Sequence, residues 1–118
     1  MKLSQHFSRQ EFACRCGCSQ DTVDAELISV LEALHSAFNH QRIIIASGNR
    51  CMAHNASTGG VRTSQHLNSK AADIRIDRIN PAAVATKLEE LYPNQYGIGR
   101  YKNWTHIDVR ASKARWER

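Results

Sequence analysis

Two short segments of this chain alternate between apolar and ionisable residues, and this alternation strongly restricts how the chain can fold. If residues 72–77 are extended, one face carries Ile74 and Ile76, and the other carries Asp73, Arg75 and Asp77. If residues 104–110 are extended, one face carries Thr105, Ile107 and Val109, and the other carries Trp104, His106, Asp108 and Arg110. Each segment therefore predicts a strand with one face on the core and one face rich in ionisable groups.

The other elements follow from periodicity and capping signals. We expect a short helix from Ser8, a helix over 24–38, a strand over 42–47, a strand over 72–77, a helix over 81–92, and strands over 96–101 and 104–110 that form a hairpin. The polar segment 51–69 is predicted to be a long functional loop. Strands and helices do not alternate regularly, so the predicted class is α+β, a small antiparallel sheet with helices packed on one face.

Length and charge limit the classes of function. With 118 residues the chain is expected to be a single domain over 1–118, and we expect a monomer. The net charge of +5 favours a polyanionic partner such as nucleic acid, a membrane surface or the bacterial wall. No apolar stretch is long enough for membrane insertion, and the start has no Sec signal, which predicts synthesis in the cytoplasm. The basic C-terminal residues are equally compatible with a solvated tail.

Four cysteines leave three interpretations open. Cys14, Cys16 and Cys18 are spaced more tightly than the ligands of most structural zinc sites, and Cys51 stands far away. Together with His54 they could form a structural metal site, or Cys14 and Cys51 could form a disulfide. Free thiols in a reducing cytosol are the third interpretation.

One combination of side chains on the predicted strands and loop suits a metal. His66, Asp73 and His106 would supply two imidazoles and one carboxylate, and three protein ligands with one open position are typical of catalytic zinc. Such zinc lowers the pKa of a bound water to about 7 and polarises a carbonyl group. The other histidines, His6, His35, His40 and His54, are interpreted as surface or core residues.

The same residues carry a family resemblance. Ser64-Gln-His66, Asp73 and Trp104-Thr-His106-Ile-Asp108 resemble the zinc-binding motifs of the D-Ala-D-Ala carboxypeptidase family of zinc metallopeptidases. The likeness is closest to its small single-domain, phage endolysin-like members. It extends in order through HFSRQEFACRCGC, IIIASGNRCMAHN, GGVRTSQHLNSKAADI, GIGRY and WTHIDVR. It implies a hedgehog/D-Ala-D-Ala-peptidase-like fold.

The resemblance also implies roles for single residues and a substrate. His66, Asp73 and His106 would hold one catalytic zinc ion. Arg50 would bind substrate and stabilise charge on the attacked carbonyl, and Ser64 would line the substrate site. The implied substrate is an amide bond in the stem peptides or cross-links of bacterial peptidoglycan. An endolysin of this kind would act at the cell wall or periplasm after the membrane is permeabilised.

The chain departs from the family pattern where a catalytic base is expected. Many relatives have Glu or His just before the last ligand, but here Asn103 and Trp104 stand there, and neither can act as a base. Asp108 is the nearest candidate for the general base. Its alternative role is to contact His106 or to pair with Arg110 or Arg50.

Three functional hypotheses follow. The first is a zinc peptidase that cuts peptidoglycan, as a phage or prophage endolysin. The second is a non-catalytic wall-binding or virion structural module with the same fold. The third is a zinc-stabilised nucleic-acid binder built on the cysteines. It is disfavoured because no basic helix accompanies them, so nucleic acid is not the expected partner.

Overall fold

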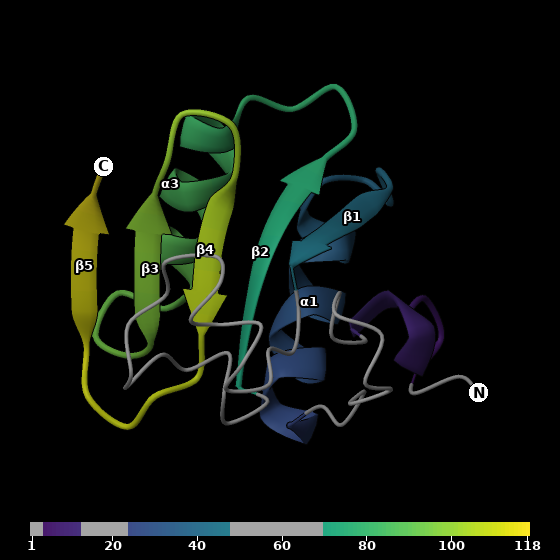
Figure 1. Cartoon of the computed structure of the whole chain (residues 1–118), viewed down its shortest axis with the longest axis horizontal. Coiled ribbons are helices and arrows are strands. Elements are labelled where there is room, and N and C mark those ends of the chain that lie inside the picture. Colours follow the sequence, from purple (N-terminus) through teal and green to yellow (C-terminus); the bar gives the residue numbers. More distant parts are fainter. Residues whose placement is uncertain (1–3, 13–23, 48–69) are drawn as a thin grey trace, which may run out of the picture.

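The computed structural model describes residues 4–12, 24–47 and 70–118, which form a sheet with helices on one side (Figure 1). In chain order the elements are the 3₁₀ helix η1 (Arg9–Phe12), α1 (Ala25–Ala37), β1 (Ile43–Ser47), β2 (Ala71–Ile76), α3 (Pro81–Leu91), β3 (Gly97–Arg100), β4 (Thr105–Asp108) and β5 (Ala114–Glu117). The predicted loop over 51–69 lies outside the described residues. The predicted α+β class is confirmed.

The sheet has five strands in the order β1-β2-β4-β3-β5. Every neighbouring pair is antiparallel except β3 and β5, which run parallel. The predicted hairpin is the antiparallel pair β3 and β4. The sequence did not predict β5, because half of its four residues are charged and it lacks an apolar run. Arg115, part of the basic C-terminal group, lies in this strand, and its guanidinium donates to the carbonyls of Tyr92 and Gln95.

Both long helices begin close to where the sequence predicts, each after a residue whose side chain caps the first turn. The Asp24 side chain accepts a hydrogen bond of 2.8 Å from the backbone N–H of Glu26 at the start of α1. The Asn80 side chain accepts one of 2.9 Å from Ala82 at the start of α3, where Pro81 is the first helical residue. These bonds satisfy N–H groups that have no partner within the helix, so they fix where each helix starts.

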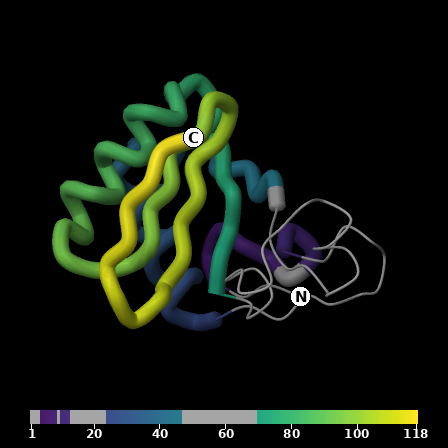
Figure 2. The backbone as a smooth tube through the Cα atoms, turned by 60° about the vertical axis from the view of Figure 1, so that its left-hand side comes forward, coloured from purple at the N-terminus to yellow at the C-terminus, as the bar shows by residue number. Residues whose placement is uncertain are grey.

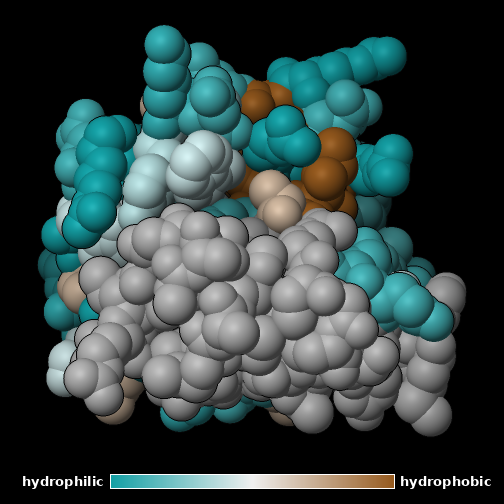
Figure 3. Space-filling model, in the orientation of Figure 1, coloured by the Kyte–Doolittle hydropathy of each residue, from teal (hydrophilic) through white to brown (hydrophobic). Residues whose placement is uncertain are grey.

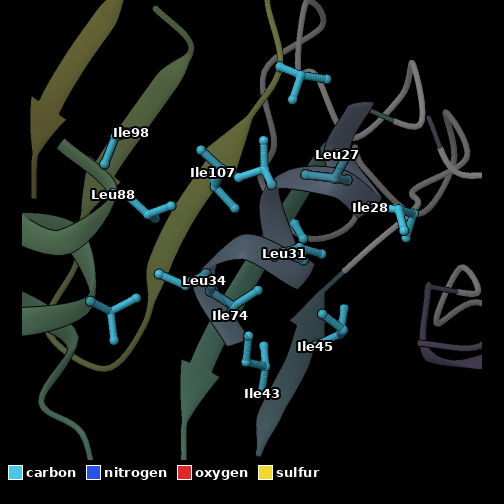
Figure 4. Close-up of a cluster of buried hydrophobic side chains, with 14 of the residues drawn as sticks. Leu27, Ile28, Leu31, Leu34, Ile43, Ile45, Ile74, Leu88, Ile98 and Ile107 are labelled. Carbon is cyan, nitrogen blue, oxygen red and sulfur yellow. The ribbon is translucent and has the colours of Figure 1, made fainter. Parts of the chain in front are cut away.

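The core lies between the helices and one face of the sheet. Helix α3 lies behind the strands in Figure 1 and to one side of them in Figure 2. Leu31 and Leu34 of α1 and Leu88 of α3 are completely buried, as are Ile74 of β2 and Ile107 of β4 (Figure 4). Burying each such side chain contributes about 1.5–3 kcal/mol. Because this face is filled with apolar side chains, the ionisable residues of β2 and β4 occupy the opposite face.

The described surface is mainly polar on the side drawn in Figure 3, where hydrophobic side chains form only small areas. Among the described residues, the large apolar side chain of Leu91 stands out with 41% of its surface exposed. None of the helices in the described ranges is long and apolar enough to cross a membrane.

Candidate metal centre

The register of the sheet brings two predicted ligands face to face. Asp73 of β2 is the cross-strand partner of His106 of β4, and Gly99 of β3 is its partner on the other side. Two residues further along β4, Asp108 lies opposite Gly97. Since alternate residues of a strand share a face, Asp73, His106 and Asp108 all lie on the side of the sheet away from the helices.

The imidazole of His106 lies between two carboxylates. Its Nδ1 atom is 2.9 Å from Oδ1 of Asp73, and its Nε2 atom is 2.7 Å from Oδ2 of Asp108. The residue is almost buried, with 7% of its surface exposed. Burial alone would lower the pKa of His106, but its hydrogen bonds to Asp108 and Asp73 outweigh this effect and raise the pKa. The two carboxylates beside this ring therefore favour its protonated, positively charged form.

Asp108 is fully buried and is held by a guanidinium as well as by His106. Nε of Arg110 donates to its Oδ1 and Nη2 of Arg110 donates to its Oδ2, both at 2.7 Å. Burial by itself would raise the pKa of Asp108, yet hydrogen bonds from Arg110 and His106 hold this pKa well below its usual range. The carboxylate is therefore ionised throughout the physiological pH range.

Strand β5 adds an aromatic side chain to this group. The ring of Trp116 lies 5.0 Å from the ring of His106, measured between centroids, and the guanidinium of Arg110 lies 5.2 Å from the Trp116 ring centroid. A Cβ atom on Gly99 would come within 2.5 Å of the Trp116 ring, and one on Gly97 within 2.5 Å of the Asp108 carboxylate. The two glycines thus leave the space that these side chains occupy.

The structure brings together some of the predicted site residues and leaves others undescribed. Asp73, His106 and Asp108 form one hydrogen-bonded group. The predicted third ligand His66 and the predicted substrate residues, Arg50 and Ser64, lie outside the described residues. Trp116 was missed by the sequence analysis, and no short-range pattern marks it because it reaches the site through the non-local pairing of β5 with β3.

The side chains present suit a divalent cation such as zinc. An imidazole nitrogen and a carboxylate oxygen are ligands that zinc prefers, and here they face each other from two central strands of the sheet. The second ring nitrogen of His106 is hydrogen-bonded to the carboxylate of Asp108, and metal-binding histidines usually form such a bond through the nitrogen that does not bind the metal. Asp73 and His106 therefore fit two of the three expected ligand positions.

Comparison with known proteins identifies the family. A search among curated proteins finds no match to this chain. The family model described as Peptidase M15 matches residues 5–108, which include all the described residues of the candidate metal centre except those that follow β4. The chain therefore belongs to the M15 family of zinc-dependent peptidases, the D-Ala-D-Ala carboxypeptidase family that its motifs resemble.

Proposed function

We propose that this protein hydrolyses an amide bond in the stem peptides or cross-links of bacterial peptidoglycan, with one zinc ion held by His66, Asp73 and His106. The observation that carries the proposal is the 2.9 Å contact between Asp73 and His106 on the face of the sheet opposite the helices. Membership of the M15 peptidase family supports both the metal and the substrate class. We also propose that the chain acts as a monomeric, single domain.

When bound, zinc supplies Lewis acidity to polarise the attacked carbonyl group. The protein's own residues would position the metal and the substrate. Asp73 and His106 are on neighbouring strands that are buried against the core, so their ligand atoms are held with little freedom. Nε2 of His106 donates to Asp108, so the atom that would hold the metal is Nδ1, which lies on the side of Asp73.

For Asp108 we propose a positioning role, one of the two alternatives that its sequence context leaves open. Both of its oxygens accept hydrogen bonds, from Arg110 and from His106. Its pKa is held well below the usual range by these bonds, which outweigh burial, and such a weak base accepts a proton poorly. Asp108 would orient the His106 ring, and the general base would be another group.

Arg50 and Ser64 are proposed to contact the substrate. A guanidinium forms paired hydrogen bonds with a carboxylate or stabilises a developing oxyanion, so Arg50 suits either the terminal carboxylate or the attacked carbonyl. The net charge of +5 is compatible with the anionic bacterial wall. We propose, as the finer role, a phage or prophage endolysin that reaches the wall after the membrane is permeabilised.

The proposal is tested by incubating the purified protein with Gram-negative peptidoglycan and identifying the released fragments by mass spectrometry. We expect new amino and carboxyl ends in the stem peptides or cross-links, and loss of this release after chelation with recovery on adding zinc. Asp73→Asn should abolish release because it removes a charged ligand. Asp77→Asn is the matched control, because Asp77 follows the same strand but is exposed.

Two results would overturn the peptidase proposal. If fragments are released equally by the chelated protein and by Asp73→Asn, the hydrolysis does not depend on this centre. If no fragment is released although the wild type binds zinc and sediments with peptidoglycan, the chain is the non-catalytic wall-binding module instead. Because the test identifies the bond that is cut, it also separates a carboxypeptidase from an endopeptidase.

A further inference from the structure

A second group of histidines lies away from the candidate metal centre. His6 precedes η1, His35 lies in the last turn of α1, and His40 follows α1. One ligand atom from each of the three side chains can be chosen so that all lie within 4.8 Å of one another. Helix α1 packs on the face of the sheet opposite Asp73 and His106, so the three histidines form a separate cluster.

The three rings are close enough to share one ion. Nδ1 of His35 and Nδ1 of His40 are 3.0 Å apart. The rings of His6 and His35 are stacked with centroids 3.9 Å apart, and those of His6 and His40 are 5.8 Å apart. Tetrahedral zinc ligands at about 2.0–2.1 Å from the ion are about 3.3 Å from each other. The Nδ1 atoms of His35 and His40 would have to move only slightly apart to bind one ion. The His6 ring would have to rotate, and its side chain, which is 28% exposed, has room to do so.

A carboxylate stands behind the first histidine of the cluster. Oε1 of Glu32 is 2.5 Å from Nδ1 of His6, and Oε2 of Glu32 accepts a hydrogen bond of 2.9 Å from the backbone N–H of His6. A carboxylate at Nδ1 holds the proton on that nitrogen and turns the lone pair of Nε2 outward. Glu32 therefore orients His6 as a metal ligand is usually oriented, and its negative charge offsets part of the charge of a cation.

The backbone holds His40 in an unusual conformation beside His35. Asn39 and His40 both have positive φ, 55° and 64°, and the N–H of His40 donates to the carbonyl of His35 at 2.9 Å. A residue with a side chain rarely adopts a left-handed backbone, so the surrounding structure must hold this turn in place. The turn brings the His40 ring back to within 5.0 Å of the His35 ring.

We propose that His6, His35 and His40 bind a second divalent metal ion, with Glu32 as the carboxylate that orients His6. Three neutral imidazoles select ions of the zinc, nickel and copper class over magnesium or calcium. Because the ligands come from the segment before η1 and from the end of α1, the ion would fasten that segment to the helix. The role is structural and does not depend on the proposed peptidase activity.

The test is a zinc titration of the full chain, monitored by long-range ¹H–¹⁵N NMR of the imidazole nitrogens together with the zinc content after dialysis. We expect the ring signals of His6, His35 and His40 to shift together as one equivalent binds. His6→Ala and His40→Ala should each lower the zinc content by one equivalent. Both side chains are partly exposed, so the variants should fold, and circular dichroism checks this.

Two further variants sharpen the test. Glu32→Gln keeps all three imidazoles but removes the orienting charge, so the affinity for zinc should fall about 10–100-fold. Ser36→Ala is the matched control, since Ser36 is exposed in the same turn of α1 and contributes no imidazole. If the ring signals do not respond to zinc, and His6→Ala and His40→Ala retain the wild-type zinc content, the cluster is only a hydrogen-bonded group of histidines. Such a result would leave the proposed peptidase centre untouched.

Discussion

Both oxygens of the Asp108 carboxylate accept hydrogen bonds, from Arg110 and His106. A substitution of Asp108 therefore distinguishes two roles for it, orienting the metal ligand His106 and transferring a proton. Asp108→Asn keeps the shape of the side chain but removes the charge that faces His106 and Arg110. We expect the affinity of this variant protein for zinc to be about 10–100-fold lower than that of the wild type, as is typical when the hydrogen-bond partner of a ligating histidine is removed. Competition with a chromogenic chelator measures this affinity.

The same variant distinguishes the alternative role. A general base takes no part in holding the metal, so Asp108→Asn would then retain wild-type zinc affinity and lose only turnover. That outcome would contradict the positioning role and restore Asp108 as the candidate base. Partial recovery of activity at high zinc concentration would instead support positioning, because mass action refills a weakened site.

Tyr96 is expected to make the folding stability of the protein depend on pH in the alkaline range. Burial raises the pKa of Tyr96 from its ordinary value of 10.0 to about 12, and the 2.6 Å hydrogen bond from its hydroxyl to Glu26 adds to the rise. A group whose pKa is raised on folding stabilises the protein below its unfolded pKa, and this contribution is lost as pH rises through the folded value. The native state should therefore lose stability between about pH 10 and pH 12.

Tyr96→Phe removes both the hydrogen bond and the titration. We expect it to lower the free energy of unfolding at neutral pH by about 1 kcal/mol. Its stability should also fall less steeply than that of the wild type above pH 10, where Tyr96 titrates. Urea unfolding at a series of pH values measures both effects. Parallel alkaline declines for the two proteins would show that other groups dominate that pH range.

Among the strands, the lack of a side chain at Gly99 of β3 leaves the space in which the Trp116 ring of β5 lies beside His106. A Cβ atom at position 99 would lie 2.5 Å from that ring, and 3.0 Å is about the closest approach that real side chains show. Gly99→Ala should therefore displace the indole and reduce the intensity change of Trp116 fluorescence on metal binding. It should leave the zinc content unchanged, because neither ligand strand is altered.

Trp104 also fluoresces, so a Trp104→Phe background isolates the Trp116 signal. Trp104 stacks on Tyr101 with ring centroids 4.9 Å apart, and the Tyr101 hydroxyl accepts a 2.9 Å hydrogen bond from Nε1 of Trp116. Phe is chosen at position 104 because it keeps an aromatic ring against Tyr101. An unchanged Trp116 signal in Gly99→Ala would show that the sheet adjusts without moving the ring. Loss of zinc in the same variant would show that the fit between β3 and β4 itself controls the ligands.

Elements with local signals were predictable from the sequence. The capping pattern at Ser8 is present, since Glu11 accepts a 2.7 Å hydrogen bond from the backbone N–H of Ser8. Alternation identified β2 and β4 because one face of each is apolar. Strand β5 has no such face, and its partner β3 is distant along the chain. Its existence depends on tertiary pairing, which local patterns do not encode.

In the molecule as a whole, the kinds of ligand can be predicted from the sequence, whereas the order of the strands in the sheet brings these ligands together. Asp73 and His106 are separated by a helix and another strand, yet β2 and β4 are neighbours in the sheet. Their shared face follows from strand periodicity, whereas their direct opposition follows from register, which periodicity leaves undetermined. The histidine cluster went unrecognised for a related reason: its members have no common spacing and meet only when the segment before η1 packs on α1.

Strand β5 ends the described sheet on one side, with its outer backbone groups unpaired by any described strand. Such edges are where folded chains join into aggregates, and short length and charge discourage that joining. Here the edge is four residues long and carries Arg115 and Glu117. The strand that places Trp116 beside His106 thus also limits edge-to-edge association between copies of the chain.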